Sequence, residues 1–139
     1  MSLNLNILSL KKKLFSKKIK SVSVPGEKGY FSIFRNHISL LTFLKSGLII
    51  IKKKNKKTEY FFILKGILEI QKNVINILTN HAINVKYLDK SILIDQKNKI
   101  ENKYKNFKNI RSLNIIKKKY FIILDKLNCI TKVQKIQNK

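Results

Sequence analysis

Hydrophobic and polar residues alternate along the chain as far as Val85. Leu3, Leu5 and Ile7 alternate with asparagines, and a period of two is typical of a strand with one buried face. The same pattern predicts further strands over residues 15–24, 30–34, 37–44 (after a bend), 47–53, 59–65, 67–71 and 74–79. About eight short strands at this spacing predict a β-sandwich or barrel.

A run of lysines separates two of these strands. Residues 52–57 read KKKNKK. Because adjacent ammonium groups repel one another and cannot be buried together, the run predicts a solvated hairpin loop.

The hydrophobic period lengthens to between three and four residues after Val85, which predicts a first helix from about Asp89 to Phe107. Asp89 is placed to cap this helix and to complement its dipole. The apolar positions of the helix are Leu88, Ile92, Ile100, Tyr104 and Phe107.

A second helix is predicted after Asn109, with Ser112 as its cap. Its apolar residues step 3-4-3-4-3, as in a coiled-coil seam: Leu113, Ile116, Tyr120, Ile123, Leu127 and Ile130. Two helices joined by a short loop form an antiparallel hairpin. The segment Tyr120–Leu124 has enough strand propensity to be a buried strand instead. The predicted fold is α+β, with a β-sandwich over residues 1–86 and a helical hairpin over 87–139.

Three of the four glycines, Gly26, Gly29 and Gly47, lie in one stretch that directly follows the only proline. Glycine serves where the backbone takes φ > 0 or approaches another strand closely, so this stretch is predicted to contain strict turns. The fourth, Gly66, stands before a strand and is predicted to permit a close approach.

The chain carries 31 basic and 7 acidic side chains, a formal net charge of +24. Such a balance points to nucleic acid or an anionic membrane. However, only two of the basic residues are arginine and there is a single alanine, while Lys, Ile and Asn abound, as expected of an AT-biased genome. We therefore interpret much of the charge as lysines at solvated surface positions.

Several classes of chemistry find no support in the sequence. One cysteine, Cys129, excludes an internal disulfide, and neither it nor His81 has partners at metal-ligand spacing. No Walker motif, Ser-His-Asp order or carboxylate pair is visible, so neither catalysis nor a cofactor is predicted. Charged residues interrupt every apolar run, and the N-terminus lacks the order of a signal peptide, which predicts a soluble protein in a reducing compartment.

Two blocks of the sequence resemble the ε subunit of bacterial F-type ATP synthases. The first block matches the family pattern without gaps at Gly26, Gly29, Ile33, Phe34, His37, Leu40, Leu41, Thr42, Lys45 and Gly47. The second comprises residues 66–70, 74–78 and 82–83. The resemblance runs from Leu3 to about Asp89. The helical tail that follows agrees with the family in length and position but scarcely in residues.

Four positions depart from the family. In the second block, Lys65 stands in place of the first glycine of the family's Gly-Gly pair. Arg35 and Ser39 replace the usual prolines on either side of His37, so that loop should be less rigid. Ile92 replaces the arginine of an Asp-x-x-Arg signature that would begin at Asp89 and that is associated with nucleotide binding. Without that guanidinium the helix has no bidentate phosphate donor, so the tail is not expected to bind ATP.

The resemblance implies a non-catalytic rotor subunit at the foot of the central stalk, between the γ subunit and the c-ring. Glu27, Lys28, Tyr30, His37 and Thr42 would then form the c-ring and stalk contact. The hairpin would be a regulatory tail that reaches the α/β catalytic head and inhibits ATP hydrolysis, with residues Asp89, Ile92, Lys117, Lys118 and Lys119. Such a subunit associates peripherally, through the complex, with the cytoplasmic face of the bacterial inner membrane or the equivalent organelle membrane.

Three alternatives follow from the charge. A small basic RNA-binding or ribosomal protein would cluster its lysines on one face with aromatic residues between them, whereas here they fall in turns and on polar helix faces. Gly26-x-x-Gly29 could be the phosphate-clamping loop of a KH domain, but that loop joins helices and this one joins strands. A polybasic membrane-surface adaptor is the third.

Overall fold

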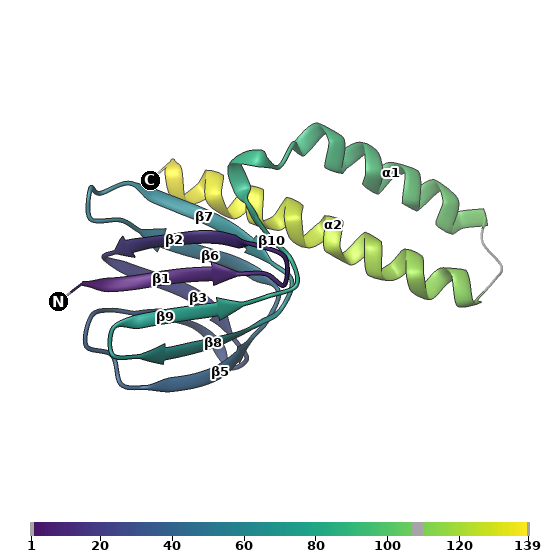
Figure 1. Cartoon of the computed structure of the whole chain (residues 1–139). Coiled ribbons are helices and arrows are strands. Elements are labelled where there is room, and N and C mark those ends of the chain that lie inside the picture. The colour runs from purple at the N-terminus through teal and green to yellow at the C-terminus, as the bar shows by residue number, and fades with distance from the viewer. Residues whose placement is uncertain (1, 107–109, 139) are drawn as a thin grey trace. The chain divides into compact units, whose positions relative to one another are not determined.

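The computed structural model describes residues 2–106 and 110–138, and the side chains of residues 104–106 and 110–113 lie outside that description. The chain divides into two compact units, Met1–Val85 and Lys86–Lys139. The first is a nearly closed β-sandwich and the second holds two helices, as predicted (Figure 1).

Ten strands lie in the described part of the first unit. They are β1 (Leu3–Leu8), β2 (Lys13–Ile19), β3 (Ser21–Gly26), β4 (Gly29–Ile33), β5 (Leu40–Leu44), β6 (Gly47–Lys52), β7 (Thr58–Ile63), β8 (Gly66–Gln71), β9 (Val74–Leu78) and β10 (Ala82–Asn84).

Two features of this strand pattern differ from the prediction. The strand predicted over residues 15–24 is broken at Lys20, because β2 pairs with β1 whereas β3 pairs with β4 and β6. The strand β10 was not predicted. It has three residues, all half-buried, which is too short a segment for a period of two to be recognised.

The strands follow the order β10-β7-β6-β3-β5-β8-β9-β1-β2, with β4 paired to β3. All pairs are antiparallel except β1 with β9, and β3 meets β5 only at Gly26 and Leu44. The rings of Phe15 on β2 and Phe61 on β7 approach edge to face, with centroids 5.8 Å apart. This contact brings the two sides of the sandwich together where the sheet does not close by hydrogen bonds.

The core is formed by the inward residues of the alternating strands. On β1, Leu3, Leu5 and Ile7 are buried while the residues between them are half-buried, as the period of two predicted. Each fully buried aliphatic side chain stabilises the fold by roughly 1.5 to 3 kcal/mol. The other buried members of the cluster are Phe15, Ile19, Val22, Val24, Ile33, Leu44, Ile49, Ile51, Phe61, Ile63, Leu68, Ile70, Ile75 and Ile77.

The sandwich has two ends, which we name by the residues found there. At the glycine end, Gly26 pairs with Leu44, which pairs with Gly66. At the asparagine end, the backbone N–H of Asn36 donates to Oδ1 of Asn73 over 2.6 Å, and Nδ2 of Asn73 donates to Oδ1 of Asn36 over 3.2 Å. Both asparagines have φ of 65°, so these bonds join two tight turns at the asparagine end.

Gly66 lies close to the backbone of the neighbouring strand β9. A Cβ atom there would lie 2.9 Å from the backbone carbonyl oxygen of Leu78, whereas at Gly47 the nearest atom is the Tyr30 hydroxyl at 3.2 Å. Backbone in a paired strand yields less than the tip of a side chain. We therefore expect Gly66→Ala to destabilise the protein by about 1 to 3 kcal/mol and Gly47→Ala by less. Thermal melts of both variants test this order, and a Gly66→Ala melt identical to that of the parent would contradict it.

The second unit contains α1 (Lys90–Asn106) and α2 (Ile110–Gln137), preceded by a short 3-10 turn η1 (Val85–Tyr87). Oδ1 of Asp89 accepts a hydrogen bond of 2.9 Å from the N–H of Ser91, so Asp89 caps α1 as predicted. The segment Tyr120–Leu124 lies within α2 and is not a strand. Ser112 also lies inside α2, so the predicted cap is wrong, since the helix begins at Ile110. The predicted apolar positions Tyr104, Phe107 and Leu113 fall outside the described side chains.

Candidate protein-interaction surfaces

An apolar row crosses the outward face of four neighbouring strands. Phe43 of β5 pairs with Ile67 of β8, which pairs with Leu78 of β9, which pairs with Leu8 of β1. The exposed fractions of the first three side chains are 60, 39 and 47%, and Leu8 is half-buried. With strands about 4.8 Å apart, the apolar row is about 14 Å long. These four strands lie side by side in Figure 1.

The next register position across the same strands is polar on three of them. Leu41 is 70% exposed, but the partners that follow it are Glu69, Asn76 and Asn6. Nδ2 of Asn6 donates to Oδ1 of Asn76 over 2.9 Å. Because Asn6 and Asn76 already hydrogen-bond to each other, they do not need a hydrogen bond from a partner protein. The apolar row and Leu41 are therefore the part of this face suited to burial against a partner.

Contiguous exposed apolar side chains of this kind mark protein contacts more often than isolated ones do. An exposed aromatic flanked by aliphatic residues and bordered by polar groups has the composition of an interface core with its rim. This surface was not predicted from the sequence. A signal was present in β5, where four of the five residues in LLTFL are apolar, so that both faces of the strand carry apolar side chains.

A second surface lies at the turn between β3 and β4. Glu27 and Lys28 are exposed at its tip, and Gly29 has φ of 125°, a conformation that other residues rarely adopt. Tyr30 is 47% exposed, and its hydroxyl accepts a hydrogen bond of 3.1 Å from the N–H of Leu48. That bond holds Tyr30 against the start of β6, so three of the five predicted contact residues are adjacent at the glycine end.

The other two predicted contact residues, His37 and Thr42, lie apart from Glu27, Lys28 and Tyr30. His37 lies in the loop after β4, at the asparagine end, a whole strand away from Glu27, so the expectation that it lies near that turn is wrong. Its Nδ1 donates to the carbonyl oxygen of Ile38 over 2.8 Å, a local bond that orients the ring. Thr42 is half-buried between the exposed Leu41 and Phe43, so it faces the opposite side of β5 from the apolar row.

The predicted tail residues are also separated by the structure. Ile92 is 55% exposed, and Leu93 beside it is 6% exposed. The prediction that Ile92 is a packed position of the apolar stripe is therefore wrong, because the inward side of α1 falls one residue later. Lys117, Lys118 and Lys119 are all exposed on α2 and form a basic segment.

Tyr120 and Glu101 connect the two helices. The Tyr120 hydroxyl donates to Oε1 of Glu101 over 2.9 Å, and Nζ of Lys97 lies 3.7 Å from the same oxygen. This hydrogen bond, together with burial and the negative charge of Glu101, raises the pKa of Tyr120 above its usual value of 10.0. The phenol is thus held in its protonated form.

A pH dependence follows from the Tyr120 contact. A raised folded-state pKa means that the stabilisation is fully present below pH 10.0 and is lost as the pH rises through the folded value. Helix melts of the parent and of Tyr120→Phe, followed by circular dichroism, should therefore differ at neutral pH and converge at strongly alkaline pH. A difference that stays constant as the pH rises past the usual tyrosine value would contradict this account.

The described residues contain neither a metal-binding cluster nor a membrane-spanning helix. Within 2–106 and 110–138, no group of three or more His, Cys, Asp or Glu side chains is arranged to hold a metal ion. In the same ranges, neither helix has the length and apolar character needed to span a membrane. Burial and the nearby charge of Asp125 raise the pKa of the Cys129 thiol to about 11.

Comparisons with known proteins agree with this arrangement. Residues 2–85 match the family model described as ATP synthase, Delta/Epsilon chain, beta-sandwich domain. One similar structure is a chain in the mitochondrial ATP synthase of Euglena gracilis, from a structure of OSCP, F1 and the c-ring in rotational state 1. The superposition has a TM-score of 0.76 at 12% sequence identity, and it covers 96% of this chain and 81% of that one. Another is a chain in the central stalk and c-ring structure of the Tetrahymena thermophila mitochondrial ATP synthase. Its TM-score is 0.52 at 14% sequence identity, and the match covers 63% of this chain and 69% of that one.

Proposed function

The chain belongs to the ATP synthase delta/epsilon chain family, and from this premise we propose that it is a non-catalytic rotor subunit that links γ to the c-ring. Such a subunit transmits torque by holding two partners at once, which requires a rigid body with two separate contact surfaces. The observation that carries the proposal is the apolar row on a hydrogen-bonded sheet, together with a second surface at the β3–β4 turn.

We assign the apolar row to γ. Burial of Phe43, Ile67 and Leu78 against a partner would remove three exposed apolar side chains from water, and each is worth roughly 1.5 to 3 kcal/mol when fully buried. The row lies on a sheet whose strands are all paired, so little backbone ordering would be needed on binding. A contact of this kind persists at high salt.

We assign the β3–β4 turn to the polar loops of the c-ring. Glu27 and Lys28 offer opposite charges at an exposed tip, and the hydrogen bond from Leu48 to Tyr30 holds the base of the turn in place. His37 lies at the other end of the sandwich, and Thr42 is half-buried, so neither is part of this proposed contact.

The helical unit is proposed as a regulatory tail. Its exposed Lys117, Lys118 and Lys119 suit an acidic surface of the catalytic head, to which electrostatic attraction would guide them. Through these partners the protein would associate peripherally with a membrane, on the cytoplasmic face in a bacterium or the equivalent face in an organelle.

Capture from native membranes tests the proposal. The full chain, tagged at one terminus and expressed in cells that make the complex, is purified after detergent extraction, at low and at high salt. We expect γ and c subunits to be retained at both. Recovery of ribosomal RNA in place of these subunits, or loss of all partners at high salt, would contradict the rotor assignment.

A further inference from the structure

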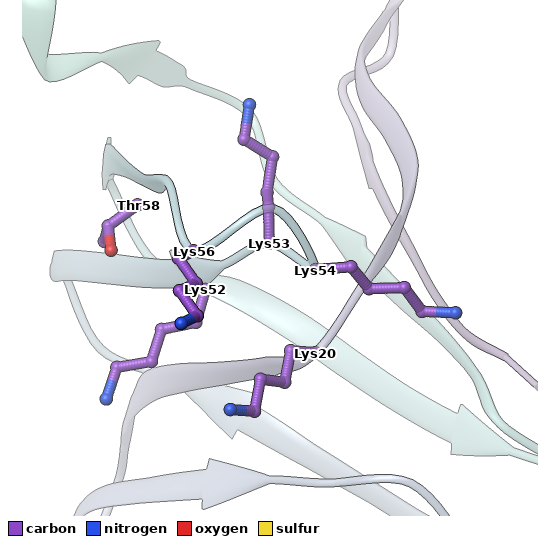
Figure 2. Close-up of a pocket in the computed structure, with 6 residues that line it drawn as sticks. All are labelled: Lys20, Lys52, Lys53, Lys54, Lys56 and Thr58. Carbon is purple, nitrogen blue, oxygen red and sulfur yellow. The ribbon is translucent and has the colours of Figure 1, made fainter.

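A lysine pocket of about 420 Å³ lies on the sandwich, lined by Lys20, Lys52, Lys53, Lys54, Lys56 and Thr58 (Figure 2). It is at the asparagine end, far from the β3–β4 turn. Lys20 comes from the β2–β3 junction, whereas the other residues come from the end of β6, the following loop and the start of β7. Residues more than 30 positions apart in the sequence therefore meet here.

The backbone holds the pocket walls together. The N–H of Lys20 donates to the carbonyl oxygen of Lys52 over 2.8 Å. Within the loop, the N–H of Lys53 donates to the carbonyl oxygen of Lys57 over 2.9 Å, and the N–H of Lys57 donates to Oδ1 of Asn55 over 3.0 Å. The lysines consequently project from a folded loop, not from an open coil.

Two of the five lysines have partners outside the pocket. Nζ of Lys53 lies 3.1 Å from Oε2 of Glu59, and Nζ of Lys54 donates to the Ser2 hydroxyl over 3.3 Å. In Figure 2 both side chains extend away from the ammonium groups of Lys20, Lys52 and Lys56, which lie on the same side of the loop. Among the residues that the structure describes, no carboxylate is within ion-pairing distance of these three.

We propose that the lysine pocket binds a compact polyphosphate group through Lys20, Lys52 and Lys56. Three ammonium groups around one hollow repel each other, and a ligand with several negative charges would relieve that repulsion. Lysine binds phosphate as a point charge, and the Thr58 hydroxyl adds a hydrogen-bond donor. The volume lies within the range of small-molecule sites, and a hollow favours a compact group over an extended strand.

The proposed site is independent of the rotor role, because none of its residues belongs to the apolar row or to the β3–β4 turn. Two sources could supply the same chemistry. One is a free polyphosphate, such as a nucleoside triphosphate, and the other is a lipid headgroup that carries several phosphates.

Calorimetry of the full chain with inorganic tripolyphosphate and with ATP tests for binding of a free polyphosphate. Flotation with neutral vesicles, with and without phosphatidylinositol bisphosphate, tests for binding of a lipid headgroup. We expect one saturable site for at least one source, weakened at least about tenfold in the triple variant Lys20→Gln, Lys52→Gln, Lys56→Gln. Lys53 is left unchanged in this variant, because its removal would leave Glu59 without its ion pair.

The matched control is Lys11→Gln, Lys12→Gln, Lys13→Gln, which removes the same charge from exposed positions in the β1–β2 connection and at the first residue of β2, at the glycine end. Its affinity should stay within about twofold of the parent. Equal losses in both variants would overturn the site, since the overall charge alone would explain the binding. Absence of binding to both sources, or binding only to an RNA homopolymer, would also overturn it. Circular dichroism of both variants verifies that each is folded.

Discussion

Phe43→Asp is expected to reduce capture of γ by at least about thirtyfold while the protein remains folded. The residue is the most exposed member of the apolar row and its only aromatic, and aromatic residues at the centre of an interface contribute about 2 kcal/mol or more. A carboxylate in that position would also be buried without a partner. Because the side chain points away from the core, the cost to the sandwich is limited to the lower strand propensity of aspartate.

Phe121→Asp is the matched control for this experiment. Phe121 is 58% exposed, close to the 60% of Phe43, but it lies on α2 outside the apolar row. The quantities to compare are the amount of γ retained on the tagged chain and the melting temperature of each variant. Normal capture by Phe43→Asp, or an equal loss in both variants, would show that the apolar row is not the γ contact.

Leu68→Ala is expected to destabilise the sandwich by about 3 kcal/mol. Leu68 is fully buried at the centre of β8, so truncation removes core contacts and leaves a cavity that strands paired on both sides cannot close. For a chain of this size the melting temperature should fall by roughly 10 °C.

Leu41→Ala provides the comparison for the core variant. It makes the same chemical change on the neighbouring strand, at a residue that is 70% exposed. Its melting temperature should therefore stay close to that of the parent, since an exposed side chain leaves no cavity. If Leu41→Ala melts as early as Leu68→Ala, the two faces of this sheet have been assigned the wrong way round.

Local periodicity was enough to predict most of the fold. The alternation of Leu3, Leu5 and Ile7 identified β1 and its buried face, and the lysines of residues 52–57 identified a loop. Asp89 was recognised as a cap because a capping side chain bonds to the backbone two or three residues ahead of it. The position of Ile92 was misjudged, since neighbouring residues on a helix differ by 100° in direction and the pattern there admits either Ile92 or Leu93.

Contacts between distant residues could not be predicted in this way. The apolar row depends on the register of three strand pairs, and the lysine pocket depends on β2 ending beside β6. His37 and Glu27 are ten residues apart, yet β4 separates them by its full length. Side-chain periodicity is a property of adjacent residues along the chain, whereas strand order and register arise from packing the whole core. For this protein the strands and helices could therefore be predicted from the sequence. The surfaces that they form together were decided by tertiary packing.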